Sequence, residues 1–230
     1  MDSLPQELIN AIIDSIPSSS LRSSSLIARR WCHRSRKRAF KCIVIESEYE
    51  AGLWCKNVSQ GSDRTSSFVH FAHFISVPWW NDPALFGRVL KGLTSLTALW
   101  VFDTGIPDEL QDRISRGELG KEITTLGFLF PLCTHATMMS LILSLPSLKK
   151  LIVQSDGLTS EEPLPTHPVT SCEEPLDRLQ LRGDVNGVGK TLFKSQFMFR
   201  RLILDLSISC AEQLIVLSAE TVVELQLYGV

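Results

Sequence analysis

The segment of this chain that comes closest to a ligand-binding motif is glycine-rich. Residues 183–191 read GDVNGVGKT and follow an expected strand, as the phosphate-binding loop of nucleotide-binding proteins does. That loop needs four residues between its first glycine and the Gly-Lys pair, so that successive backbone N–H groups converge on the phosphates. Here five residues separate Gly183 from Gly189. We therefore interpret the segment as a turn and reject an NTP-dependent enzyme.

The histidine, cysteine and carboxylate residues show no spacing typical of a metal centre or a catalytic group. Two residues separate His70 from His73, one separates Cys133 from His135, and neither pair belongs to a four-ligand set. Adjacent glutamates at 161–162 lie in a proline-rich segment, and no Ser/His/Asp or Cys/His arrangement suggests a nucleophile. We expect a non-catalytic protein without a metal or another cofactor.

Basic residues are concentrated between positions 29 and 41, where seven Lys or Arg occur. One interpretation is a nuclear-localisation signal or a nucleic-acid patch. The other, which is simpler, is a solvated basic face, since no interleaved aromatic residues suggest base stacking. The formal net charge is −2, so the chain as a whole does not attract polyanions and we expect no nucleic-acid partner.

The body of the chain contains a sequence repeat, which predicts where charged and polar side chains lie in the fold. An apolar hexad, φ-x-x-φ-x-φ, recurs six times, and its central residues lie 27, 25, 28, 23 and 23 positions apart: Leu99, Leu126, Leu151, Leu179, Leu202 and Leu225. Two earlier and weaker copies are Phe40/Ile43/Ile45 and Phe71/Phe74, the latter with Ser76 in its last slot. Each hexad predicts a short strand whose first, fourth and sixth residues point inward.

Helical patterns lie between the hexads. The expected helices begin at Asp82-Pro83 and Pro107-Asp108, and two more cover residues 134–145 and 209–218. Strands and helices that alternate at this period predict a parallel sheet with helices on one face. An ordinary α/β domain with coincidental spacing is the alternative.

The first forty residues follow a different pattern. Apolar residues at helical spacing, from Leu8 to Ile16, are followed by a Pro/Ser break, a second short helix ending at Trp31 and a basic third segment closing on Phe40. Such a unit is too small to bury a core alone. Its apolar stripe therefore covers either a partner or the rest of this chain.

The N-terminal residues resemble an F-box, the motif that docks on the Skp adaptor of cullin–RING ubiquitin ligases. The matching positions are Leu4-Pro5, Glu7-Leu8, Ile12-Ile13, Ile16-Pro17, Leu21, Leu26, Arg29 and Trp31. The hexads resemble degenerate leucine-rich repeats. Together the two resemblances imply an α/β chain with a three-helix F-box at 1–45 and an irregular leucine-rich-repeat solenoid with a parallel sheet at 46–230.

These resemblances imply a substrate-receptor subunit of a Skp–cullin–F-box ubiquitin ligase, which binds Skp and an unidentified target protein. The alternative is a protein-interaction scaffold that works independently of a ligase. The resemblance places seven apolar residues at or near the adaptor: Leu4, Pro5, Leu8, Ile12, Ile13, Leu21 and Leu26.

The repeats would offer their outward side chains to the target. Several outward hexad positions are basic and fall on three adjacent strands, where they would attract an acidic or phosphorylated segment. The candidate target-binding residues are Lys149, Lys150, Arg178, Arg182, Arg200 and Arg201. Ordinary solvated charge is the alternative.

Two segments leave alternatives open. Residues 155–175 contain four prolines, four glutamates and no helical period, which predicts an extended loop that is either inert or regulatory. The last hexad ends close to Val230 without a polar capping repeat, so the chain is either part of a longer product or ends on an exposed edge strand.

Cysteine usage and hydropathy indicate the cellular compartment in which we expect the protein. The six cysteines are scattered without a C-x-x-C pair, and the longest apolar stretch, residues 138–148, is too short to span a membrane. We expect free thiols in the reducing cytoplasm or nucleus and no membrane partner.

Overall fold

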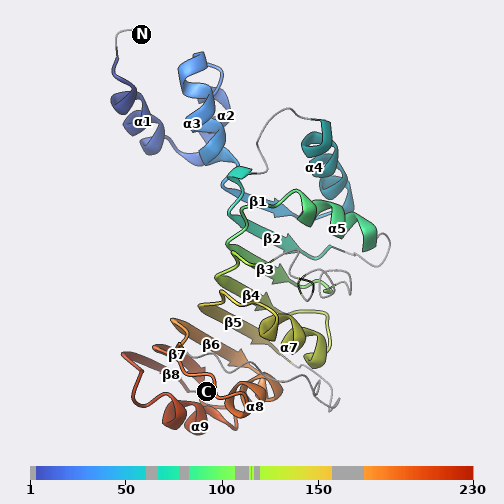
Figure 1. Cartoon of the computed structure of the whole chain (residues 1–230), viewed down its shortest axis with the longest axis vertical. Helices are drawn as coiled ribbons and strands as arrows, with labels where there is room; N and C mark the ends of the chain where they lie inside the picture. Colours follow the sequence, from blue (N-terminus) through green and yellow to red (C-terminus); the bar gives the residue numbers. More distant parts are fainter. Residues whose placement is uncertain are drawn as a thin grey trace.

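The computed structural model describes residues 4–60, 67–77, 83–106, 114, 116, 120–156 and 174–229. Its centre is an α/β assembly with an eight-stranded parallel sheet in which every strand lies beside its neighbours in sequence, β1 to β8. The strands succeed one another along the longest axis of the molecule (Figure 1). Helices cover one face of this sheet, and the other face is open.

The strands are short and regularly spaced. They are β1 (Cys42–Ile45), β2 (Phe71–Ile75), β3 (Ala98–Phe102), β4 (Thr125–Leu129), β5 (Lys150–Ser155), β6 (Arg178–Gly183), β7 (Arg201–Asp205) and β8 (Glu224–Tyr228). The helices between them are α4 (Glu48–Gln60), α5 (Pro83–Lys91), α7 (His135–Leu143), α8 (Asn186–Lys194) and α9 (Ala211–Leu217).

The strand pairing confirms the register that the six hexads predict. Their central leucines stand opposite one another on consecutive strands, and those from Leu99 to Leu202 are 0 % exposed. Leu225 continues the row but is 42 % exposed. This difference arises because β8 is the last strand of the described sheet, so its inner face is covered from one side only.

The register that the sequence predicts for the weaker copy of the hexad at β2 is wrong by two residues. Ala72 and Phe74, not Phe74 and Ser76, align with Leu99 and Val101 on β3, and both are fully buried. Phe71 instead aligns with Ala98 and belongs to the open face. The small side chain of Ala72 gave a weaker apolar signal than the two phenylalanines, which explains the wrong alignment.

A repeated backbone feature ends several strands. Ser76, Asp103, Phe130 and Gly183 occupy equivalent positions, four residues after the aligned central residue, and all have positive φ, between 45° and 72°. The amide of Asp103 donates to the carbonyl of Leu129 at 2.9 Å, and that of Phe130 donates to Gln154 at 2.7 Å. The turn therefore extends the ladder by one hydrogen bond before the chain leaves the sheet.

Three of the expected helices are present in the described part of the chain. They are α5, α9 and α7, and Thr134 caps α7 by accepting a hydrogen bond from the Thr137 amide at 3.1 Å. Most of the helix predicted at 107–117, and residues 157–173 of the predicted loop, lie outside the described residues.

Two helices were not predicted. Helix α4 lacks a strong apolar stripe, and α8 replaces the turn expected in the glycine-rich segment. The glycines of α8 serve close packing. A Cβ on Gly189 would overlap the Cys210 sulfur, and one on Gly187 would come within 3.2 Å of the His135 ring.

The N-terminal residues form a separate group of helices at one end of the sheet (Figure 1). These are α1 (Gln6–Ser15), the 3₁₀ turn η1 (Ser18–Ser20), α2 (Leu21–Ser24) and α3 (Arg29–Ala39). We call residues 4–40 the helical unit. Residues 42–45, expected inside the N-terminal domain, form β1 and pair with β2, so the boundary between helices and sheet lies before Cys42.

Within the described residues, no helix combines the length and the apolar character needed to cross a membrane.

Candidate functional site

The helical unit has a small core of its own. Ile9, Ile13, Leu21 and Trp31 are at most 8 % exposed and pack together, with Leu4, Ile16 and Ala28 partly buried around them. This cluster lies apart from the continuous core between the sheet and its helices. A core of four side chains contributes little stability by itself, so other contacts must hold the helices together.

Arginines of α3 supply those contacts. The Arg34 guanidinium donates to both carboxylate oxygens of Asp14, at 3.0 and 2.5 Å, and its hydrogen bond holds the pKa of Asp14 below the ordinary value. Arg38 donates to the carbonyls of Ile13 and, at 3.1 Å, Ile16, where a cation is favourable at the C-terminal end of α1. The basic run at 29–41 is therefore partly structural.

The seven residues expected at the adaptor divide into two groups. Ile13 and Leu21 lie in the core of the unit, and Leu4 is partly buried beside them. Leu8, Ile12 and Leu26 are 52 %, 40 % and 81 % exposed, and Pro5 is also exposed. The exposed group can contact a partner directly, while the buried group fixes the helices that carry it.

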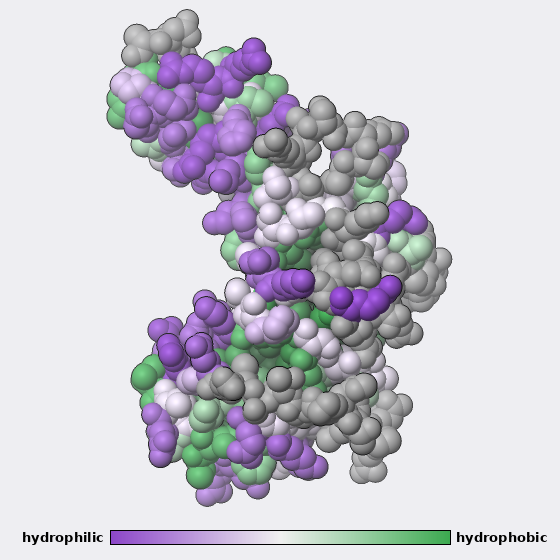
Figure 2. Space-filling view, in the orientation of Figure 1, coloured by the Kyte–Doolittle hydropathy of each residue, from purple (hydrophilic) through white to green (hydrophobic). Residues whose placement is uncertain are grey.

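Four of the exposed apolar residues of the unit form two pairs. Leu8 and Ile12 stand one turn apart on the outer side of α1. Leu26 and Ile27, the latter 52 % exposed, follow α2. Green, hydrophobic surface shows on two sides of the otherwise purple unit in Figure 2. The helical unit thus leaves uncovered the kind of side chain that protein interfaces bury.

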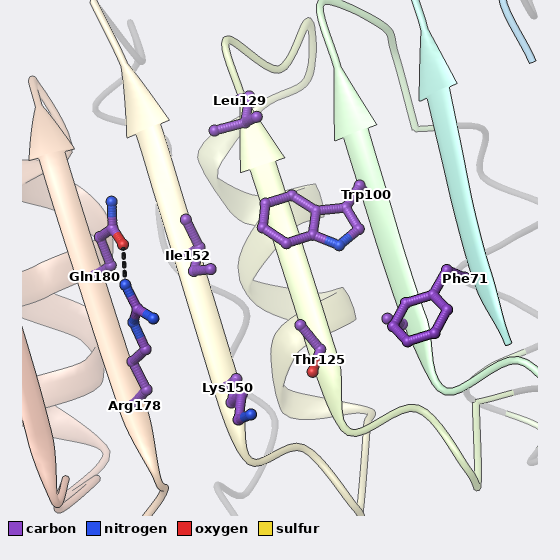
Figure 3. Close-up of a pocket in the computed structure, with 9 residues that line it drawn as sticks. Phe71, Trp100, Thr125, Leu129, Lys150, Ile152, Arg178 and Gln180 are labelled. Carbon is purple, nitrogen blue, oxygen red and sulfur yellow. Dashed lines mark hydrogen bonds between the residues drawn. The ribbon is translucent and has the colours of Figure 1, made fainter. Parts of the chain in front are cut away.

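The open face of the sheet carries the second candidate surface. In its middle, a hollow of about 520 Å³ is lined by Phe71, Trp100, Leu129, Ile152 and, at its far side, Lys150 and Arg178 (Figure 3). We call this the Trp100 hollow. Its side chains come from five consecutive strands, β2 to β6, so only the stacking of the strands brings them together.

Gly127 determines how the indole lies in this hollow. Trp100 stands opposite Gly127 in the ladder, and its ring extends across β4 (Figure 3). A Cβ on Gly127 would overlap the six-membered ring, so the absence of a side chain lets the indole lie on the backbone. From the neighbouring strand β2, His73 stacks with the indole at 5.8 Å between ring centroids and 15° between planes. Burial lowers the pKa of His73, which favours its neutral form.

A second hollow, of about 500 Å³, adjoins the first. It is lined by Lys150, Arg178, Arg200 and Arg201 together with Asp177, Thr221 and Val223, and we call it the basic hollow. Lys150 and Arg178 line both hollows, which therefore share a border. Arg200 lies 3.9 Å from Asp177 and Arg201 3.5 Å from Glu224, so four cations face two carboxylates.

The structure thus brings together four of the six basic residues that the hexads singled out. Lys149 is exposed beside Lys150 but lines neither hollow. Arg182 lies at the other end of β6, about 13 Å from Arg178 along the strand, with its guanidinium carbon 4.3 Å from the ring centre of Tyr228. The hexad at 96–101 predicts that Trp100 points outward, but that pattern does not mark it as part of a binding surface. The wrong register of β2 placed Phe71 inward.

Cys133, His135 and Lys190, which were also considered for chemistry, do not line either hollow. His135 is buried at the start of α7, and its Nε2 has no hydrogen-bond partner among the described residues. Burial raises the pKa of the Cys133 thiol to about 12, so it is not a thiolate nucleophile at neutral pH. Lys190 is exposed on α8. No three His, Cys, Asp or Glu side chains converge into a metal-binding group within the described ranges.

No protein-family model matches this chain, and no curated protein matches its sequence at a significant level.

Proposed function

We propose that this chain is the substrate-receptor subunit of a Skp–cullin–F-box type ubiquitin ligase, built from an F-box and irregular leucine-rich repeats and working in the cytoplasm or nucleus. The helical unit binds the Skp adaptor, and the open sheet face binds a target protein. A receptor of this kind breaks no bond. It holds the target close to a ubiquitin-loaded enzyme and so raises the effective concentration of the reacting groups.

The observation that carries this proposal is the division of apolar residues on α1. Ile9 and Ile13 supply the core of the helical unit, while Leu8 and Ile12 remain exposed on its outer side. A monomeric helix of this size has no structural need for a second apolar stripe, because its interior side is already covered. The second stripe fits a partner helix surface, as the sequence resemblance to an F-box implies.

Capture of a purified Skp adaptor tests the proposal. The variant Leu8→Ala/Ile12→Ala removes two exposed anchors and should weaken adaptor binding by more than tenfold, since central apolar anchors contribute about 2 kcal/mol or more each. Leu206→Ala/Val216→Ala is the matched control, because these residues are 56 % and 69 % exposed near the other end of the chain and line neither hollow. The control should bind as the unaltered chain does.

Unchanged affinity in the Leu8→Ala/Ile12→Ala variant would show that the adaptor does not contact this stripe. No capture of the adaptor by the unaltered chain, with the fold intact by circular dichroism, would favour a scaffold that works independently of a ligase.

A further inference from the structure

The Trp100 hollow offers a flat apolar floor that is held in place before any ligand arrives. The indole lies on the β4 backbone at Gly127 and stacks with His73 of the neighbouring strand β2. Leu129 and Ile152 border the hollow from β4 and β5. A rigid aromatic floor with aliphatic borders suits an aromatic or large aliphatic side chain, since little conformational entropy is lost when it binds.

The cations beside this floor are also oriented. Arg178 donates through Nη2 to the Gln180 side-chain oxygen at 2.8 Å, which fixes the plane of its guanidinium (Figure 3). Its buried Nε has no hydrogen-bond partner in the described part of the chain. The Lys150 ammonium forms neither an ion pair nor a hydrogen bond with the described residues. An anion placed between Lys150 and Arg178 would therefore gain donors without displacing an existing partner.

The basic hollow continues the cationic surface over β7. The pairs Arg200–Asp177 and Arg201–Glu224 are long and roughly half exposed, so they contribute little and can exchange for a ligand carboxylate. Neighbouring parallel strands lie about 4.8 Å apart, so the path from the Trp100 floor over β4 to Arg201 on β7 is about 14 Å. An extended peptide covers that distance with about four residues.

We propose that the adjoining hollows bind an extended acidic peptide segment that crosses the strands. One aromatic or large aliphatic side chain lies on Trp100, and carboxylates one to four residues away contact Lys150, Arg178 and Arg201. The proposal rests on the proposed function in one respect, because it specifies the chemistry of the target that the receptor holds.

Charge and shape favour a peptide over a single-stranded nucleic acid. Both ligands could stack on an aromatic side chain next to cations. A nucleic acid presents a phosphate at every residue, however, and Asp177 and Glu224 stand beside the outer cations where such a backbone would have to continue. The aliphatic borders at Leu129 and Ile152 add apolar contact that a charged backbone cannot use.

Fluorescence anisotropy with labelled synthetic peptides tests this proposal on the full chain. One peptide carries Phe, Gly and a run of Glu, and a second has the reverse order, because the direction of the segment is open. We expect one of the two to bind, with affinity that falls at high salt. Replacing the Glu residues by Gln, or the Phe by Ser, should weaken binding about tenfold or more.

Variants of the protein assign the binding to the hollows. Lys150→Ala/Arg178→Ala should weaken binding about tenfold or more, since it removes charge-assisted hydrogen bonds. Lys190→Ala/Lys194→Ala is the matched control, because both lysines are exposed on α8 and outside the hollows. Melting temperatures verify the fold, and the Phe-to-Ser peptide tests the apolar contact without altering Trp100.

Failure of both peptides to bind, or equal binding by the Lys150→Ala/Arg178→Ala variant, would overturn the proposal. So would an oligothymidine that binds more tightly than either peptide and loses its affinity in the same variant. The peptide assay contains no adaptor, so a negative result in it does not bear on adaptor capture, which is a separate measurement. Peptide binding without adaptor capture would instead contradict the proposed function alone.

Discussion

The helical unit and the strand–helix array, which consists of strands β1 to β8 and the helices between them, differ in the contacts that stabilise them. In the array, one apolar core runs from Ile43 on β1 to Leu214 on α9, and each strand from β2 to β7 buries its inward residues against two neighbouring strands. The helical unit buries four apolar side chains and adds hydrogen bonds from Arg34 and Arg38 to tie α3 to α1. The array is stabilised by repetition, whereas the unit depends on a few contacts.

The two regions also leave different chemistry exposed. The helical unit presents aliphatic side chains such as Leu8 and Leu26, and the array presents an aromatic floor next to cations. A small unit with an uncovered apolar stripe gains stability when a partner covers it, because binding then contributes to folding. The array needs no such cover for its core. Under the proposed function, we therefore expect a constitutive partner on the helical unit and an exchangeable ligand on the sheet.

The largest expected effect tests the array. Leu179→Ala should lower the free energy of unfolding by about 2–5 kcal/mol, because the residue is fully buried between Leu151 and Leu202 in the central row. Urea denaturation followed by circular dichroism measures this change. Leu225→Ala is the matched control in the same row and should cost much less, since Leu225 is 42 % exposed. Equal costs would show that the strands do not share one core.

A smaller effect tests the helical unit. Arg38→Met keeps the aliphatic stem but removes the guanidinium that binds the last carbonyls of α1, at a cost of about 1–3 kcal/mol. The loss should appear in hydrogen exchange as reduced protection of α1 amides, with the amides of β5 to β7 unchanged. Lys37→Met, an exposed neighbour on α3, is the control. Protection lost equally in α1 and in the sheet would show that the two regions unfold together.

The smallest effect concerns pH. Burial lowers the pKa of His135 below its ordinary value of 6.5, so the unfolded chain takes up a proton at a higher pH than the folded chain does. The stability of the array should therefore fall as the pH drops below about 6.5. The change in melting temperature between pH 7.5 and 5.5, chosen to span about one unit on either side of that value, should be smaller in His135→Gln. His73, whose pKa is also lowered by burial, accounts for part of what remains.

A His135→Gln variant that keeps the full pH dependence would show that this buried imidazole does not titrate with folding. The amides of α1 should keep their protection over the same pH range, because the polar contacts of the helical unit use arginines and Asp14.

Most of the sheet could be predicted from the sequence. Six hexads gave the correct strands and register, because alternation in a strand requires apolar residues at fixed positions whatever lies around it. The register failed at β2, where Ala72 occupies the central slot. The sequence also did not indicate helix α8, because Gly187 and Gly189 suggest a turn until their neighbours His135 and Cys210 are known.

The candidate surfaces could be predicted only in part. Basic residues at outward positions of adjacent hexads led to Lys150, Arg178, Arg200 and Arg201, which the structure places around one hollow. The sequence could not indicate that Arg182 turns to Tyr228 instead, or that the indole of Trp100 lies on Gly127. Both depend on side chains from other strands, whose order and spacing no local pattern contains.

The sequence by itself determined which residues face inward on strands β3 to β8 and that a short helical segment precedes the repeat, because both follow from periodicity along the chain. Only the tertiary structure decided which apolar residues of α1 are covered and which cations meet an aromatic floor. Leu8, Ile9, Ile12 and Ile13 look alike in a helical pattern, yet α2 and α3 bury Ile9 and Ile13 and leave Leu8 and Ile12 exposed. The physical reason is that burial is a property of packed elements, whereas periodicity is a property of one.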